Sequence, residues 1–166
     1  MYTIISGTNR EGSNTQKVAI QYQELLSGKG IDARLVSLIG IDLNRRTPEL
    51  TRLEEETLIP SEKFIFILPE YNGSYPGSLK TLIDLSDIRR VWGGKKALLT
   101  GVSTGRAGNL RGMDHLAGSL NYLKVHVHHD KLPISSVDKL LQADGKIHDP
   151  ATLTAIEHQL NEFIKY

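Results

Sequence analysis

Apolar runs rich in β-formers alternate with longer segments of helical periodicity along the whole chain. The runs predict strands over residues 2–6, 31–38, 63–69, 96–102 and 124–128. The periodic segments predict helices over residues 13–28, 48–59, 76–88, 108–122 and 150–165. Strands that alternate with helices are typical of a parallel sheet, so we expect one α/β domain over residues 1–166.

The texture of the strands predicts their order in the sheet. Residues 2–6, 63–69 and 96–102 are apolar almost throughout, as are parallel strands covered by helices on both faces. The second and fifth strands alternate apolar with polar positions, so we place them at the edges. Right-handed crossovers then favour the order 2-1-3-4-5. Ligands of such sheets bind at the switch point between strands one and three, beside the loops that follow residues 6, 69 and 102.

The first of these loops, residues 6–15, is dense in hydroxyl and amide side chains and leads directly into a helix. Backbone N–H groups at a helix start favour an anion, and Arg10 adds a fixed positive charge. No carboxylate stands in the first helical turn, residues 14–17, which also favours a bound phosphate. The alternative is a plain capping box, with Ser13 and Gln16 as its two members.

Two common phosphate motifs are absent. The chain has no G-x-G-x-x-G sequence and no acidic residue at the end of the second strand, so a dinucleotide fingerprint is missing. It also has no Gly-Lys-Ser/Thr sequence of the kind that binds nucleoside triphosphates. A mononucleotide remains.

The second loop, residues 69–80, combines aromatic faces with backbone donors. A planar heterocycle at the switch point would stack on Tyr71 or Tyr75 and accept hydrogen bonds near Asn72 and Gly73. The alternative is a tight turn, because Asn-Gly is a generic turn pair. Pro76 is placed to be the first residue of the following helix.

Composition excludes several classes of protein. The chain has 20 Lys and Arg against 19 Asp and Glu, without long blocks of one sign, so we expect no nucleic-acid partner. It contains no cysteine, which excludes iron–sulfur clusters, zinc-thiolate sites and disulfides. No apolar run approaches the length of a membrane span and the first residues do not resemble a signal peptide. We therefore expect a cytoplasmic protein that does not insert in membranes.

The sequence G-T-N-R-E-G-S-N-T, followed by P-E-Y-N-G-S-Y-P-G-S-L-K-T-L-I-D, resembles the NADPH-dependent FMN reductase family. The match runs in order over essentially the whole chain. It implies a flavodoxin-like three-layer sandwich with a five-stranded parallel sheet, FMN as cofactor and NADPH or NADH as co-substrate. It further implies a homodimer or homotetramer in which the partner chain walls part of the ring pocket.

The resemblance also implies a set of site residues. The FMN phosphate would lie in the first loop, among Thr8, Asn9, Arg10, Ser13, Asn14 and Thr15. The flavin ring would be held in the second loop, by Pro69, Glu70, Tyr71, Asn72, Gly73 and Ser74. The third loop would lie beside the ring, at Ser103, Thr104 and Gly105.

These expectations define an FMN-dependent NAD(P)H oxidoreductase. Hydride would pass from the reduced nicotinamide to FMN and then to a small acceptor such as free flavin, a quinone, an azo compound or a metal oxyanion. We expect no catalytic side chain and no metal, because the flavin carries the chemistry. The alternative is a flavodoxin-type electron carrier, which the near-zero net charge disfavours because such carriers are usually strongly acidic.

Four charged clusters lie outside the predicted site, and we interpret three of them as solvated surface. We interpret His126, His128 and His129 as a solvated sheet edge in preference to a metal site. We likewise expect Arg45-Arg46 to be a solvated loop and Lys95-Lys96 a solvated approach to a strand. Arg89-Arg90 fits either a helix C-terminus or an interface.

Overall fold

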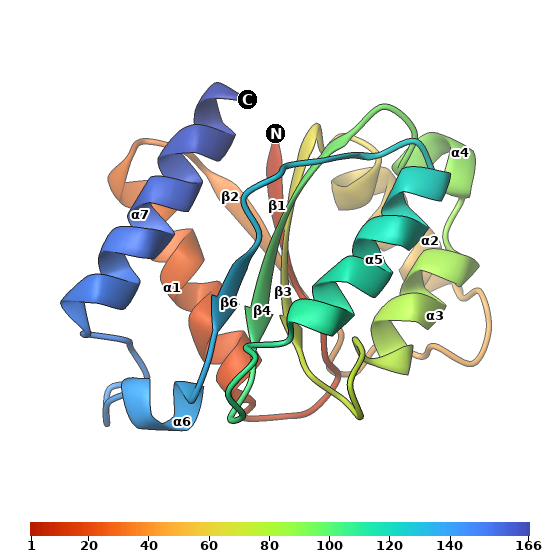
Figure 1. The fold of residues 1–166 in the computed structure, drawn as a ribbon. Helices are drawn as coiled ribbons and strands as arrows, with labels where there is room; N and C mark the ends of the chain where they lie inside the picture. Colours follow the sequence, from red (N-terminus) through yellow and green to blue (C-terminus); the bar gives the residue numbers. More distant parts are fainter.

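The computed structural model describes all 166 residues and is built on a parallel sheet (Figure 1). The sheet order is β2-β1-β3-β4-β5, with β6 also paired to β4, and every pairing is parallel. The predicted order and the edge position of the second strand are therefore confirmed. The strands are β1 (Tyr2–Ser6), β2 (Ala33–Ser37), β3 (Lys63–Pro69), β4 (Lys96–Val102), β5 (His126–Val127) and β6 (Leu132–Ile134).

Helices cover both faces of the sheet, which makes the predicted three-layer sandwich (Figure 1). One face carries α1 (Asn14–Gly28) and α7 (Pro150–Lys165). The other face carries α2 (Pro48–Leu53), α3 (Gly77–Leu85) and α5 (Leu110–Tyr122). The short elements are the π-helical segment η1 (Glu54–Leu58), α4 (Ile88–Val91) and α6 (Val137–Leu140).

The strands divide the buried side chains between two cores. On the α3 and α5 face, 19 buried residues pack together, and Phe64, Phe66 and Trp92 form their aromatic centre. On the α1 and α7 face, 16 buried residues pack together, among them Tyr22 and Phe163. Successive strand residues point to opposite faces, so a strand that is apolar throughout serves both cores.

The predicted fifth strand, residues 124–128, is shorter than expected and forms only the first part of this edge of the sheet. β5 pairs with the start of β4, the chain then leaves the sheet, and β6 pairs with Thr100–Val102 at the other end of β4. The Gln159 side chain connects the segment between β5 and β6 to β4, because its Nε2 donates to the backbone oxygens of Leu99 and Asp130 at 3.1 and 2.9 Å. Two short strands therefore share the edge position predicted for one.

Two predicted helices are also subdivided. The helix predicted over 48–59 is α2 followed by η1, in which hydrogen bonds span five residues. The helix predicted over 76–88 ends at Leu85, because Ser86 adopts an extended conformation. Asp87 then caps α4 by accepting the N–H groups of Arg89 and Arg90.

Three of the clusters interpreted as solvated make specific contacts instead. Arg46 donates to Glu54, whose side chain is 1% exposed, and to the Leu85 carbonyl at 2.7 Å. Lys96 donates to the backbone oxygen of Tyr166 at the end of α7, where a cation is favourable. His128 is 3% exposed and lies 5.8 Å from Phe163, ring centre to ring centre. The solvated interpretation holds for Arg45, His126 and His129, which are exposed. It was wrong for His128, which is buried, and incomplete for Arg46 and Lys96, whose partners only the assembled fold reveals.

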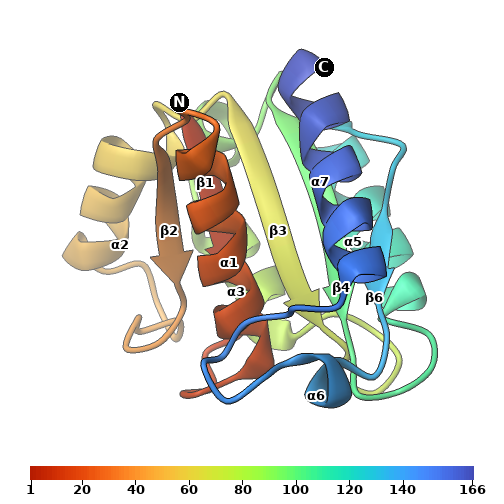
Figure 2. The same ribbon diagram turned by 90° about the vertical axis from the view of Figure 1, so that its left-hand side faces the viewer.

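The carboxyl ends of the strands meet at one end of the molecule, beside α6, and both chain termini lie at the opposite end (Figure 2). The loops that follow β1, β3 and β4 are therefore brought together. None of the helices combines the length and the apolar character that a membrane crossing requires.

Candidate functional site

The three predicted loops line a single pocket at the carboxyl ends of β1, β3 and β4. Its volume is about 330 Å³. Its wall is made by residues 10–15 of the first loop, 69–71 of the second, 102–104 of the third, and Val137 of α6. The sheet order predicted this convergence, because β1 and β3 flank the switch point.

The first loop presents unpaired hydrogen-bond donors to the pocket. The backbone N–H groups of residues 11–15 donate to no acceptor within the chain. α1 starts here, its first turn contains no acidic residue, and the Arg10 guanidinium forms no ion pair. This arrangement of helix start, free donors and positive charge is suited to an anion.

Ser13 serves as the N-cap of α1, as the capping alternative predicts. Its Oγ accepts the N–H of Gln16 at 3.2 Å, and no reciprocal bond from the Gln16 side chain completes the box. A hydroxyl that accepts one bond still has a proton to donate. The Thr15 side chain is nearly buried, at 2% exposure, and lines the pocket without an internal hydrogen bond. Capping and anion binding are therefore compatible at this loop.

Thr8 joins the first loop to the second from behind the pocket wall. Its hydroxyl is buried, accepts the N–H of Arg10 at 3.2 Å and pairs with the Tyr71 hydroxyl at 2.7 Å. The Arg10 guanidinium carbon lies 5.0 Å from the centre of the Tyr71 ring, within the range of a cation–π contact. The two loops are thus held in one arrangement by three side chains.

Residues 71–74 form a two-residue hairpin. Tyr71 and Ser74 exchange backbone hydrogen bonds of 2.8 and 3.1 Å, and Asn72 and Gly73 have φ values of 51° and 77°. Two central residues with positive φ define a type I′ turn, for which Asn-Gly is the preferred sequence. The turn accounts for both residue types by itself, as the turn alternative proposed. The N–H groups of Asn72 and Gly73 remain without an internal acceptor.

The third loop is fixed by residues that the sequence did not single out. Asn109 is 1% exposed with φ 64°, and its Nδ2 donates to the carbonyls of Leu68 and Pro69 at 3.1 and 2.8 Å. Gly101 allows the loop to approach β4, because an added Cβ would lie 2.1 Å from the Gly108 oxygen. In the sequence, Asn109 and Gly101 are marked only as an amide and a glycine within or beside a glycine-rich stretch, which does not predict these contacts.

The fifteen predicted site residues divide between the pocket wall and its surroundings. Those on the wall are Arg10, Ser13, Asn14, Thr15, Pro69, Glu70, Tyr71, Ser103 and Thr104. Those off the wall are Thr8, Asn9, Asn72, Gly73, Ser74 and Gly105. The wall also includes residues that the prediction omitted, namely Glu11, Gly12, Val102 and Val137. No group of three or more His, Cys, Asp or Glu side chains lies close enough to hold a metal ion.

The fold and the pocket define the class of protein: a flavodoxin-like α/β protein with a polar pocket at the switch point of its sheet. The free N–H groups of residues 11–15 and the polar Thr15 fit the phosphate of a mononucleotide such as FMN. The model of the NADPH-dependent FMN reductase family matches residues 2–139. The chain belongs to this family and is an NAD(P)H-dependent oxidoreductase that uses FMN.

Individual relatives support the same assignment. An NAD(P)H-dependent FMN reductase from Pseudomonas aeruginosa is 31% identical, over 94% of this chain and 89% of its own. A 2-hydroxy-1,4-benzoquinone reductase from a Burkholderia species is 27% identical, over 70% of this chain and 69% of its own. Among solved structures, the flavoenzyme NAD(P)H:(acceptor) oxidoreductase from Paracoccus denitrificans matches the fold with a TM-score of 0.80 at 23% identity, covering 99% and 95% of the two chains.

Proposed function

We propose that the pocket at the start of α1 holds the FMN phosphate. The observation that carries this proposal is the row of unpaired backbone N–H groups at residues 11–15, beside the unpaired guanidinium of Arg10. The hydroxyls of Ser13 and Thr15 add neutral donors. Glu11 and Glu70 also line the pocket, and their negative charges disfavour a phosphate anywhere except at the N–H groups.

We propose that the flavin ring lies against residues 69–74, as the family resemblance implies. Pro69 and Tyr71 offer apolar and aromatic surface at the pocket, and Ser103 and Thr104 face them from the third loop. The free N–H groups of Asn72 and Gly73 supply donors for the edge of the ring. Thr8, in this arrangement, positions Tyr71 and does not touch the cofactor itself.

The protein's part in the reaction is to bind and orient. When bound, FMN accepts hydride from NAD(P)H and transfers the electrons to an acceptor. Arg10 binds the phosphate, and the pair of Thr8 and Tyr71 fixes the hairpin. The fixed hairpin keeps its backbone donors directed at the ring. No Ser-His-Asp or metal constellation lines the pocket, so we assign no residue a role as acid, base or nucleophile.

We propose a quinone as the acceptor, in preference to free flavin, an azo compound or a metal oxyanion. The support is that one relative is a 2-hydroxy-1,4-benzoquinone reductase and two others are quinone reductases from Pseudomonas putida. A quinone is planar, so it suits the same stacking position that a nicotinamide ring would occupy. We expect the enzyme to work in the cytoplasm.

We propose that the chain acts as a homodimer. The support within the chain is an uncovered groove of about 610 Å³ between α3 and α5. It is lined by Ile83, Ile88 and Tyr122, and the Tyr122 side chain is 86% exposed. Large exposed apolar side chains beside a groove mark interaction surfaces. His115 lines the groove and also contacts the 71–74 hairpin, so a partner seated here would lie next to the proposed ring site.

Steady-state oxidation of NADPH tests the proposed function against the electron-carrier alternative. Without oxygen, we expect FMN-loaded protein to oxidise more than one equivalent of NADPH per flavin only when a quinone is added, and apoprotein without FMN to be inactive. A carrier would bind FMN and show no quinone-dependent oxidation of NADPH or NADH without a separate reductase. That outcome would reject the oxidoreductase mechanism proposed for the pocket.

A further inference from the structure

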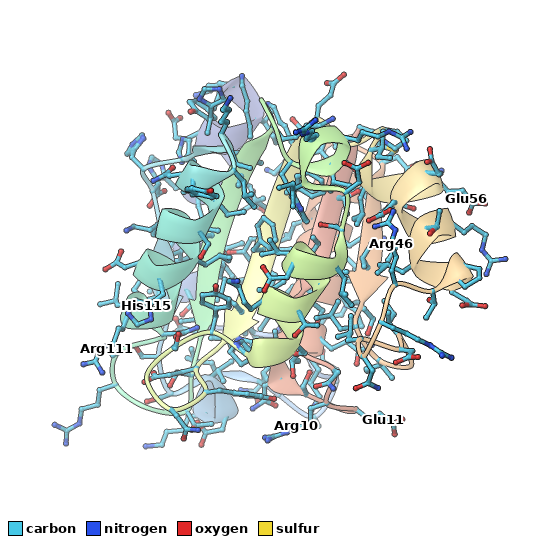
Figure 3. All side chains as sticks on the ribbon, turned by 90° about the vertical axis from the view of Figure 1, so that its right-hand side faces the viewer. Arg10, Glu11, Arg46, Glu56, Arg111 and His115 are labelled. Carbon is cyan, nitrogen blue, oxygen red and sulfur yellow. The ribbon has the colours of Figure 1, made fainter.

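One face of α5 contacts the 71–74 hairpin and the residue that follows it (Figure 3). His115 Nδ1 lies 2.9 Å from Ser74 Oγ, and one turn further along the helix Ser119 Oγ lies 3.2 Å from the Tyr75 hydroxyl. Residues four apart in sequence share a helix face, so these two contacts form a row. The row fixes the hairpin to α5.

Arg111, one turn before His115, is the first member of the same row. Its Nη1 atom lies 2.9 Å from the position that a Cβ on Gly73 would occupy, so the guanidinium rests against the bare backbone of the turn. Unlike the other two members of the row, Arg111 makes no hydrogen bond through its side chain. Its side chain is exposed.

Stability does not account for Arg111. It stands in the first turn of α5, at the positive end of the helix dipole, where a cation is unfavourable. No acidic residue lies in that turn to compensate, and the nearest acid on the helix, Asp114, pairs with Lys131 instead. Arg111 is therefore an exposed cation that has no partner within the chain and lies against the hairpin of the proposed ring site, where it is available to an anionic ligand.

The hairpin separates Arg111 from Arg10. Arg10 lies over the Tyr71 ring on the side of the first loop, whereas Arg111 and His115 lie on the α5 side (Figure 3). In the proposed function Arg10 serves the FMN phosphate, which leaves Arg111 free for a second anion. The molecule that must approach the ring next is the reduced nicotinamide nucleotide, and it carries a pyrophosphate. A guanidinium matches phosphate oxygens with paired N–H donors.

We propose that Arg111 binds a phosphate group of NAD(P)H and so positions the nucleotide over the hairpin. This inference rests on the proposed function, because it takes the FMN ring to lie at residues 69–74. Gly73 is part of the subsite: its lack of a side chain leaves room for the guanidinium, whose Nη1 lies 2.9 Å from where a Cβ would stand. Arg111 is thus a binding residue for the co-substrate and leaves the attachment of FMN to the first loop.

Binding of oxidised nucleotides to the FMN-loaded protein tests the proposal without turnover. Calorimetric titration with NADP⁺ and with NAD⁺ would compare wild type with Arg111→Gln and Arg111→Lys. The control is Arg52→Gln, which removes the same charge from an exposed position on α2, at the opposite edge of the sheet (Figure 2). We expect Arg111→Gln to raise the Kd of NADP⁺ roughly ten- to hundredfold, the loss typical of a charged hydrogen bond.

Arg111→Lys should lose less nucleotide affinity than Arg111→Gln, because lysine keeps the positive charge but lacks the paired N–H donors. Equal losses for NADP⁺ and NAD⁺ would assign the pyrophosphate to Arg111, and a loss confined to NADP⁺ would assign the 2′-phosphate. Both support the proposal. Unchanged Kd values for both nucleotides in Arg111→Gln would overturn it, as would an effect confined to the KM of the quinone.

FMN affinity separates failure of this inference from failure of the proposed function. We expect Arg111→Gln to bind FMN within about twofold of wild type, since the phosphate is held at the other side of the hairpin. If wild type binds FMN and is reduced by NADPH while Arg111→Gln behaves identically, only the Arg111 subsite is rejected. If wild-type protein binds no FMN, the proposed cofactor site itself is rejected.

Discussion

At the level of single residues, the donors in the pocket that have no partner within the chain decide where an anion can bind. Arg10 and the N–H groups of residues 11–15 are unpaired, whereas Thr8 and Ser13 already make internal hydrogen bonds. Free donors that converge on one pocket at a helix start indicate an anionic ligand more strongly than residue type does, because no group of the chain competes for them. The sequence supplied the residue types, and the structure shows which of them are free.

Arg10→Ala should weaken FMN binding without unfolding the protein. Loss of a charged hydrogen bond costs about 1.5 to 3 kcal/mol, which corresponds to roughly ten- to hundredfold in Kd. Titration of apoprotein with FMN, followed by quenching of flavin fluorescence, measures the change. Arg89→Ala is the matched control, an exposed arginine on α4 that lacks an ion pair. Equal FMN affinity in Arg10→Ala and Arg89→Ala would remove Arg10 from the site.

Variants of the Asn72-Gly73 turn test whether the hairpin works through its backbone. Asn72→Gly keeps a residue that accepts positive φ, so we expect a nearly normal flavin spectrum and reduction rate. Asn72→Ala should alter both more than FMN affinity, because the turn is strained while the phosphate loop is intact. Gly73→Val should be worst, since a β-branched residue resists φ 77°. If Asn72→Gly were as damaging as Gly73→Val, the Asn72 amide itself would have to contact the ring.

At the scale of elements, local pattern predicted most of the fold. The alternation of apolar runs with helical periodicity placed β1, β3, β4 and α1 within about a residue of their observed bounds. The split of the last strand escaped prediction because it depends on Gln159, which reaches the Leu99 and Asp130 carbonyls from a distant helix. Likewise the loop after β4 could be predicted to line the site, whereas the role of Asn109 depends on two carbonyls at the end of β3.

The packing of α7 on the edge of the sheet should make stability depend on pH. Burial lowers the pKa of His128 below its ordinary value of 6.5, with a further lowering from His129, whereas Asp130 and Glu162 act in the opposite sense. The unfolded chain therefore binds the proton more readily than the folded chain. Stability is full above the unfolded pKa of about 6.5 and is lost as the pH falls through that value toward the folded one.

His128→Asn should reduce this dependence, because the amide oxygen replaces the Nδ1 acceptor for the Asp130 N–H without titrating. The measurement is the free energy of unfolding in urea between pH 7.5 and 5, which brackets the pKa of free histidine, about 6.5. His126→Asn, an exposed neighbour on β5, is the control and should retain the wild-type slope. If the unfolding free energy of His128→Asn changed with pH as steeply as that of wild type, other groups would cause the pH dependence.

At the scale of the whole molecule, the sheet order sets where chemistry takes place. Because β2 and the β5–β6 pair lie at the edges, the loops after β1, β3 and β4 surround one pocket and the termini lie at the far end. Sequence reasoning reached this arrangement from strand texture, without any contact information. It could not reach the α5 row that includes Arg111, because which helix face meets the hairpin follows only from the assembled fold.

One experiment tests together whether the protein binds FMN and whether NAD(P)H reduces the bound flavin. The most direct measurement is the visible absorption of the FMN-loaded protein, recorded without oxygen before and after one equivalent of NADPH is added. We predict that the flavin bands bleach on addition and return when a quinone is supplied. Protein that retains FMN with bands unchanged by NADPH and by NADH, or protein that binds no FMN, would contradict it.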